Sequence, residues 1–333
     1  MWGTQVLFLS LYLVAIMAAV YVWANYSSGH TAVASTAPPP PVQTSQEKPT
    51  VNQEPAVAQQ EQPAAQAVSG QVAMNELMMQ VNPPEGYRLP AAYGDLGPRL
   101  LEAGGIDYDR FAQVYQRSGR PLSNAQLAIL TKGSDEPVLI NQENAHFLLN
   151  FFWAVGLTNA NPLLTEGMMV QASDGQIGRF ASTGGWTIGA KPATELYASA
   201  PLIALTPEQQ ALVESVAERV YRPCCNNHTA FPDCNHGMAM LGLLELMASQ
   251  GASEDEMFTA AKYINAFWFP QQAMETAVFF KSTMDLDFAQ VDGRMAVGPE
   301  VFSATGFQQM HQYLAEGGEL PQGPQGGASC GVG

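Results

Sequence analysis

Residues 238–267, MAMLGLLELMASQGASEDEMFTAAKYINAF, contain the pattern that decides the fold. The first half is almost wholly apolar, and it is followed by Gly251, a residue type that commonly ends helices. Next comes Ser253-Glu254-Asp255-Glu256, which matches a capping box, in which a serine and a Glu three positions later begin a helix together. The segment therefore predicts two antiparallel helices, 238–250 and 254–267.

The rest of the body shows similar signals. A second capping box, Thr206-Pro207-Glu208-Gln209, has proline at the first helical position and precedes apolar residues at helical spacing as far as Val220. Residues 142–157 are rich in Phe and Leu and predict a buried helix. By contrast, residues 159–200 combine glycines with Val, Ile and Thr, which favours short strands and loops. The expected fold class is mainly α, with a globular body at 87–316 and a small irregular or β segment near 159–200.

An apolar run of 18 residues spans Val6–Trp23. A helix of this length rises about 27 Å, which is enough to cross the hydrocarbon core of a bilayer. Trp2 and Tyr26 flank the run in the way that interface anchors do, and no Lys or Arg precedes it, unlike in a cleaved signal peptide. We therefore expect residues 1–26 to be an uncleaved transmembrane signal anchor. A cleaved signal peptide and a buried core helix are the alternatives.

Residues 27–86 contain no Phe, Tyr or Trp and are dominated by Ala, Pro, Gln, Val and Glu. This composition buries too little apolar surface to fold, so a disordered linker is expected. The first base after the apolar run is Lys48, and a flank without bases is typical of a translocated segment. The prediction is a protein anchored in the membrane by its N-terminal helix, with its C-terminal domain outside the cytoplasm. Residues 317–333 contain seven glycines and are expected to be a flexible tail.

The charge balance excludes some partners. The formal net charge is −16, from 30 acidic and 14 basic residues, which argues against nucleic acid and against an anionic membrane surface. The stretch from Gly184 to Lys191 is similar to a phosphate-binding loop, but Ala190 precedes the lysine and no Ser or Thr directly follows it. A nucleotide is therefore not expected as a ligand. Another protein of the cell envelope would fit the predicted location.

Five residues with metal-ligating side chains fall within 13 positions of a chain otherwise poor in Cys and His: Cys224, Cys225, His228, Cys234 and His236. They lie between two predicted helices, which would hold a short loop in place. Sulfur and imidazole ligands suit copper or zinc, with an iron–sulfur centre less favoured, and they do not suit calcium or magnesium. Asp233 is a candidate further ligand or a group that orients a histidine, and Met238 is a candidate thioether ligand.

Two other functions are open for the same cysteines. One is a thiol–disulfide redox protein that uses Cys224, Cys225 and Cys234, with Cys330 on the Gly-rich tail as a mobile partner. The expected helix start after Cys234 would favour its thiolate. The other is a non-catalytic interaction module, in which Cys224 or Cys225 forms a structural disulfide with Cys234 or Cys330. Adjacent cysteines rarely bridge each other, because their Cα atoms are closer than the usual separation in a disulfide.

The segment 221–267 resembles two exported thiol families. In the thiol subunit of the cytochrome c maturation haem lyase, a Cys-x2-Cys and an Asn-containing loop lead into a helix, a Gly-x-Ser-acidic-Glu stretch and a second helix. Cys225-Asn226-Asn227 and the stretch from Gly251 to Glu256 follow the same order here. Pro223-Cys224-Cys225 is similar to part of the Pro-Cys-Tyr-Cys-Gly-Cys motif of exported lipoproteins. The resemblance implies an exported protein with thiol chemistry, and Cys225 is the residue that matches a reactive thiol.

Overall fold

The computed structural model describes residues 74–321, and they form a mainly helical body with one two-stranded sheet. This confirms the expectation of a mainly α body for that part of the chain. After a helix at 74–81, the elements are β1 (Tyr87–Gly94), α3 (Leu96–Ala103), α4 (Tyr108–Arg117), α5 (Asn124–Lys132), β2 (Ser134–Ile140), α6 (Ala145–Thr158), α7 (Pro162–Thr165), α8 (Met168–Ser173), η1 (Ile177–Arg179), α9 (Ala181–Gly184), α10 (Ala193–Leu196), α11 (Pro207–Ala217), α12 (Asn235–Ser249), α13 (Glu254–Trp268), α14 (Pro270–Met284), η2 (Phe288–Gln290), α15 (Gly293–Ala296), α16 (Pro299–Phe302) and α17 (Ala304–Gly317).

The helix starts predicted from capping boxes are confirmed. The Thr206 side chain accepts a hydrogen bond from the Gln209 N–H at the start of α11, and Ser253 does the same with Glu256 at the start of α13. In both cases the third residue's side chain bonds back to the cap, so two otherwise unpaired N–H groups are satisfied. The predicted helix at 142–157 is α6, which is buried along nearly its whole length.

Helices α6 and α12 form the centre of the body and approach each other closely. A Cβ atom on Gly156 of α6 would lie 2.0 Å from the carbonyl oxygen of Met238, and one on Gly242 of α12 would lie 2.8 Å from the Gly156 nitrogen. Only glycine allows such an approach of two backbones. Nearly every residue of α12 is buried, so its N-terminal end is held firmly in the core.

The sheet does not lie where the sequence favoured it. Strands β1 and β2 pair antiparallel, with Tyr87 opposite Ile140, whereas the segment 159–200 forms the short elements α7 to α10 and η1. The strand prediction for 159–200 is therefore wrong apart from one isolated bridge between Asn159 and Ala200. Short helices form there because Asn161 caps a proline-led helix start and because the segment packs against α6 instead of against a neighbouring strand.

The folded body begins earlier than the predicted boundary at residue 87. Residues 74–81 are helical, and their side chains Leu77 and Val81 belong to the hydrophobic core. At the other end of the described residues, α17 ends at Gly317. The predicted anchor at 1–26, most of the linker at 27–86 and most of the tail lie outside the described residues. Within residues 74–321, the helices are too short or too polar to span a bilayer.

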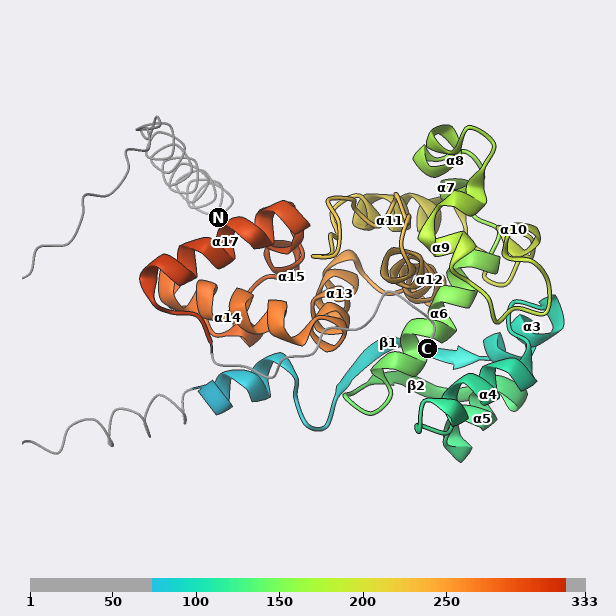
Figure 1. The fold of residues 1–333 in the computed structure, drawn as a ribbon, viewed down its shortest axis with the longest axis horizontal. Coiled ribbons are helices and arrows are strands. Elements are labelled where there is room, and N and C mark those ends of the chain that lie inside the picture. The colour runs from blue at the N-terminus through green and yellow to red at the C-terminus, as the bar shows by residue number, and fades with distance from the viewer. Residues whose placement is uncertain (1–73, 322–333) are drawn as a thin grey trace, which may run out of the picture. The chain divides into compact units, whose positions relative to one another are not determined.

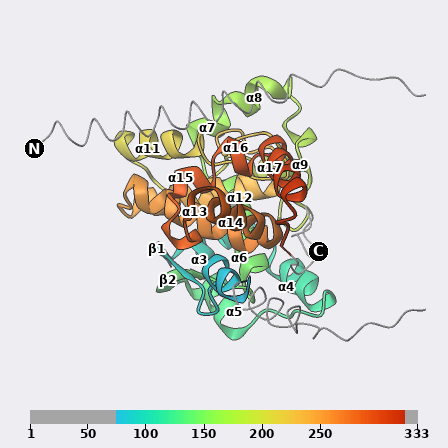
Figure 2. The same ribbon diagram turned by 90° about the vertical axis from the view of Figure 1, so that its left-hand side faces the viewer.

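In Figure 1, α12 and α13 lie between two groups of helices. Helices α14 and α17 contact each other on one side, and α3, α4 and α5 lie on the opposite side. The view in Figure 2 shows α7 and α8 at the edge opposite β1, β2 and α5. The loop between α11 and α12 contains the Cys/His segment, so the candidate site is attached to the central helix of the body.

Candidate metal centre

Cys234 is the N-cap residue of α12, the most buried of the long helices. Its Sγ accepts a hydrogen bond from the Gly237 N–H at 3.5 Å, in the manner of a serine or aspartate cap. The backbone N–H groups at a helix start create a partial positive charge that favours an anion at this position. Two residues later, His236 lies within the first turn of the same helix, so both side chains come from one rigid element.

Arg222 organises the loop that leads to this helix. The side chain is 2% exposed, and its Nε donates to Cys234 Sγ at 2.9 Å. The other guanidinium nitrogens donate to the carbonyl oxygens of Asn227 and Phe231, both at 3.0 Å, and to the Asp233 carboxylate at 2.6 Å. One buried cation thus joins four positions of the loop. The sequence analysis gave Arg222 no role, although it is the only Lys or Arg between residues 221 and 237.

Asp233 has both carboxylate oxygens occupied. Oδ1 accepts from Arg222, and Oδ2 accepts from the Asn227 amide nitrogen at 2.9 Å. The Asp233 carbonyl oxygen accepts from the Ser182 N–H at 3.0 Å, which ties the loop to α9. Asp233 therefore positions the loop through Arg222 and Asn227, whereas the sequence suggested a metal ligand or a group that orients a histidine.

Cys224 and Cys225 lie in the same loop as Arg222 and Asp233, and the sulfur of each lies within 4.8 Å of Cys234 Sγ. The Cys225 carbonyl oxygen accepts from the Ala304 N–H at 2.9 Å, and the next side chain, Asn226, accepts from the Thr305 N–H at 2.8 Å. The loop is thereby attached to the start of α17.

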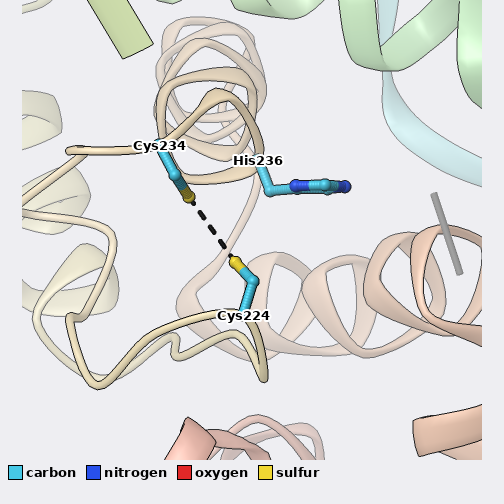
Figure 3. Close-up of side chains that lie close together, drawn as sticks. All are labelled: Cys224, Cys234 and His236. Atoms are coloured by element: carbon cyan, nitrogen blue, oxygen red, sulfur yellow. Dashed lines mark hydrogen bonds between the residues drawn. The ribbon is translucent and has the colours of Figure 1, made fainter. Parts of the chain in front are cut away.

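The structure brings the predicted ligands together in two overlapping groups. In the first, Cys224 Sγ, Cys234 Sγ and a ring nitrogen of His236 all lie within 4.8 Å of one another (Figure 3). In the second, Cys225 Sγ, Cys234 Sγ and an oxygen of Asp233 lie within the same limit. The sulfurs of Cys224 and Cys234 point towards each other across 3.6 Å. Two sulfurs bound to one tetrahedral zinc ion, at about 2.3 Å each, would be about 3.8 Å apart.

His236 is the deepest member of the cluster. The residue is 1% exposed, and its ring packs against Trp268 and Phe269, with centroids 5.7 and 4.4 Å away. Within the described part of the chain, neither ring nitrogen has a hydrogen-bond partner. A buried imidazole normally has such a partner, because an unpaired buried polar group costs about 1–3 kcal/mol.

The local charges favour one thiolate. Hydrogen bonds from the Cys224 and Cys225 thiols, together with the positive charge of Arg222, hold the pKa of Cys234 well below its usual range, although burial acts in the opposite direction. Hydrogen bonds to Cys225 and Cys234, and then burial, raise the pKa of Cys224. Burial alone would lower the pKa of Arg222, but the three cysteines and Asp233 raise it, so the guanidinium stays charged.

One predicted ligand, His228, does not join the cluster. His228 is in neither ligand group, and its ring packs edge-on against Tyr221 with centroids 5.8 Å apart. Burial lowers the pKa of His228, and its Nδ1 has no hydrogen-bond partner among residues 74–321. Met238 is fully buried in the hydrophobic core on α12. Cys330 lies outside the described residues.

The donor set fits a soft transition-metal ion. The three sulfurs and one imidazole match ligand types used by zinc and copper, and two of the four come from a rigid helix. Comparisons with protein-family models, curated proteins and solved structures found no match to this chain.

Proposed function

We propose that this protein binds one copper or zinc ion through Cys224, Cys225, Cys234 and His236. The observation that supports this most strongly is the imidazole of His236, which is buried without a hydrogen-bond partner within 4.8 Å of two cysteine sulfurs. A bound ion would satisfy that nitrogen, whereas a disulfide between the cysteines would leave it unpaired.

The proposed ligand set is four protein groups. Asp233 is assigned to orientation, because both of its oxygens already accept hydrogen bonds. Four protein ligands would close a tetrahedral ion, and a site with one ligand released would allow transfer of the ion to another molecule.

We further propose that the ion is bound outside the cytoplasm by a membrane-anchored protein, and that its partner is another envelope protein. The apolar run Val6–Trp23, the base-free segment that follows it and the resemblance of 221–267 to exported thiol families support this location. Soft metal ions are commonly bound by sulfur ligands, which agrees with the donor set.

The test is elemental analysis of the full-length chain, purified in detergent without oxygen and without a metal-affinity tag. We expect about one equivalent of copper or zinc in the wild type. His236→Ala should lose the ion, because it removes the buried nitrogen ligand. The matched control is His311→Ala, since His311 is a half-exposed histidine of α17 that belongs to neither ligand group and pairs with Glu275 of α14 at 2.7 Å.

A thiol titration on the same samples completes the test. A wild type without metal, or a His236→Ala variant that retains a full equivalent, would contradict the proposal. A wild type with no metal and no titratable thiol would support the interaction module with structural disulfides instead.

A thiol–disulfide function is the second candidate, and the 3.6 Å between the sulfurs of Cys224 and Cys234 favours it. In that reaction the two thiols lose two protons and two electrons, their sulfurs form a bond, and a substrate disulfide is reduced to two thiols. Metal-free protein should then reduce a small disulfide stoichiometrically, and Cys234→Ser should abolish the reaction. Retention of the reaction in Cys330→Ser would rule out the tail cysteine as its partner.

A further inference from the structure

We propose that the site exchanges its ion with an external thiol, and that Cys224 is the ligand that this thiol replaces. The inference rests on the proposed metal-binding function, and it identifies the acceptor by its chemistry, as a molecule that presents a free thiol group. The direction of exchange follows from differences in exposure and anchoring among the four ligands.

The four ligands differ in exposure. Cys224 is exposed, Cys225 and Cys234 are partly buried, and His236 is 1% exposed. An incoming group therefore reaches the cluster from the Cys224 side. The opposite side is closed by the rings of Trp268 and Phe269, which contact His236.

The ligands also differ in how firmly they are held. Cys234 and His236 belong to the start of α12, and Cys234 Sγ accepts hydrogen bonds from Arg222 and from the Gly237 N–H. Cys224 lies in the loop, and within residues 74–321 neither a guanidinium nor a backbone N–H group donates to its sulfur. The Cys224–metal bond is thus the one that can break with the least disturbance of the fold.

The exchange step is a ligand substitution without electron transfer. The bond between the ion and Cys224 Sγ breaks while a bond between the ion and the incoming sulfur forms. The proton of the incoming thiol moves to Cys224, so the number of thiolates on the ion is unchanged. The ion is then shared between the acceptor and the three remaining ligands, which is the intermediate required for transfer.

This intermediate can be imitated by removing the Cys224 sulfur and supplying a small thiol. We would measure the Zn²⁺ affinity of the full-length Cys224→Ser variant with and without millimolar 2-mercaptoethanol. Ethylene glycol, which has oxygen in place of sulfur, is the control additive. The thiol should enter the open position and restore affinity by at least about tenfold, and ethylene glycol should have no effect.

The matched control is Cys234→Ser. Serine is a good N-cap, so α12 should still form. The position that the Cys234 sulfur leaves is half-buried, and the Arg222 side chain lies against it, so a small thiol has little room to enter. We expect no rescue of Cys234→Ser by 2-mercaptoethanol. Rescue of both variants to the same degree, or of neither, would overturn exchange through Cys224, provided that the wild type binds Zn²⁺. A wild type that binds no metal would overturn the proposed function itself and with it this inference.

Discussion

The Nε of Arg222 donates a hydrogen bond to Sγ of Cys234 across 2.9 Å, and the arginine side chain is almost fully buried. Burying a guanidinium would destabilise the folded state if it had no hydrogen-bond acceptors. The Arg222 guanidinium donates to four acceptors. The loop and the guanidinium therefore depend on each other: the loop compensates the buried charge, and the charge fixes the loop around the thiols.

Replacing Arg222 with Met should destabilise the metal-free protein by about 3–5 kcal/mol, because the substitution removes the donor to Asp233 Oδ1 and to the carbonyl oxygens of Asn227 and Phe231. Urea unfolding followed by circular dichroism measures this. Arg219→Met is the control, since Arg219 is half-exposed and its pair with Glu254 should contribute no more than about 1 kcal/mol. Equal losses of unfolding free energy in the two variants would show that the buried hydrogen bonds of Arg222 stabilise the protein no more than the exposed ion pair of Arg219 does.

Gly237→Ala should displace Arg222. A Cβ atom at this position would lie 2.5 Å from Arg222 Cζ, and the hydrogen bonds of the guanidinium leave it little freedom to move. Overpacking of this kind costs about 1–3 kcal/mol. The cost should largely disappear in an Arg222→Ala background, and a double-mutant cycle from urea unfolding measures the difference. Additive effects of the two substitutions would contradict the contact.

Glu245 should make stability depend on pH. It is completely buried on α12, and burial raises its pKa from 4.5 to about 8, although Asn159 and Asn161 act in the opposite direction. The folded state therefore binds a proton that the unfolded state releases between these pH values, so the free energy of unfolding falls as pH rises from 4.5 to 8. The total loss should not exceed about 4 kcal/mol.

Urea unfolding of metal-free protein at pH 5 and pH 8 tests the Glu245 prediction. Glu245→Gln should remove most of this pH dependence, because glutamine does not titrate. Glu300→Gln, which alters an exposed carboxylate, should leave the dependence as in the wild type. A Glu245→Gln variant with the wild-type pH dependence would assign the effect to other groups.

Gly156→Ala should separate α6 from α12. The added methyl group would lie 2.0 Å from the Met238 carbonyl oxygen, so one of the two backbones must shift, at a cost of about 3 kcal/mol or more. Because Met238 lies in the first turn of α12, the same shift should weaken metal binding at Cys234 and His236. Isothermal titration with Zn²⁺ and thermal unfolding measure the two effects.

The control for this substitution is Gly317→Ala at the end of α17. There the nearest atom to a new Cβ lies at 3.6 Å, which is an ordinary contact. Alanine also favours the helical conformation over glycine by up to about 1 kcal/mol. The control should be neutral or slightly stabilised. A Gly156→Ala variant that behaves in the same way would mean that the two helices can separate without loss.

The helical part of the fold could be predicted because its signals are local. The Thr206 and Ser253 caps bond to residues three positions away, so the sequence alone contains both partners. The sheet could not be predicted in this way. Strand β1 contains Pro90 and strand β2 contains Pro137, which weaken the usual strand pattern, and their pairing joins segments far apart in the chain.

The sequence predicted the types of ligand in the candidate site better than it predicted their arrangement. The density of Cys and His located the cluster, and three cysteines with His236 are indeed close together. The sequence offered no means of separating His236 from His228, because the difference lies in where the folded chain places each ring. Arg222 was missed because its role depends on acceptors in a folded loop, which no spacing rule describes.

The four hydrogen bonds of Arg222 have a thermodynamic consequence for ion capture. In a zinc finger the chain becomes ordered only when the metal binds, so the free energy of coordination is spent on conformational entropy. Here a residue of the chain itself orders positions 227 to 234 during folding. Binding of an ion would then bury little further surface, and its heat-capacity change would be small. Occupancy could rise and fall with the supply of metal while the body of the protein stays folded.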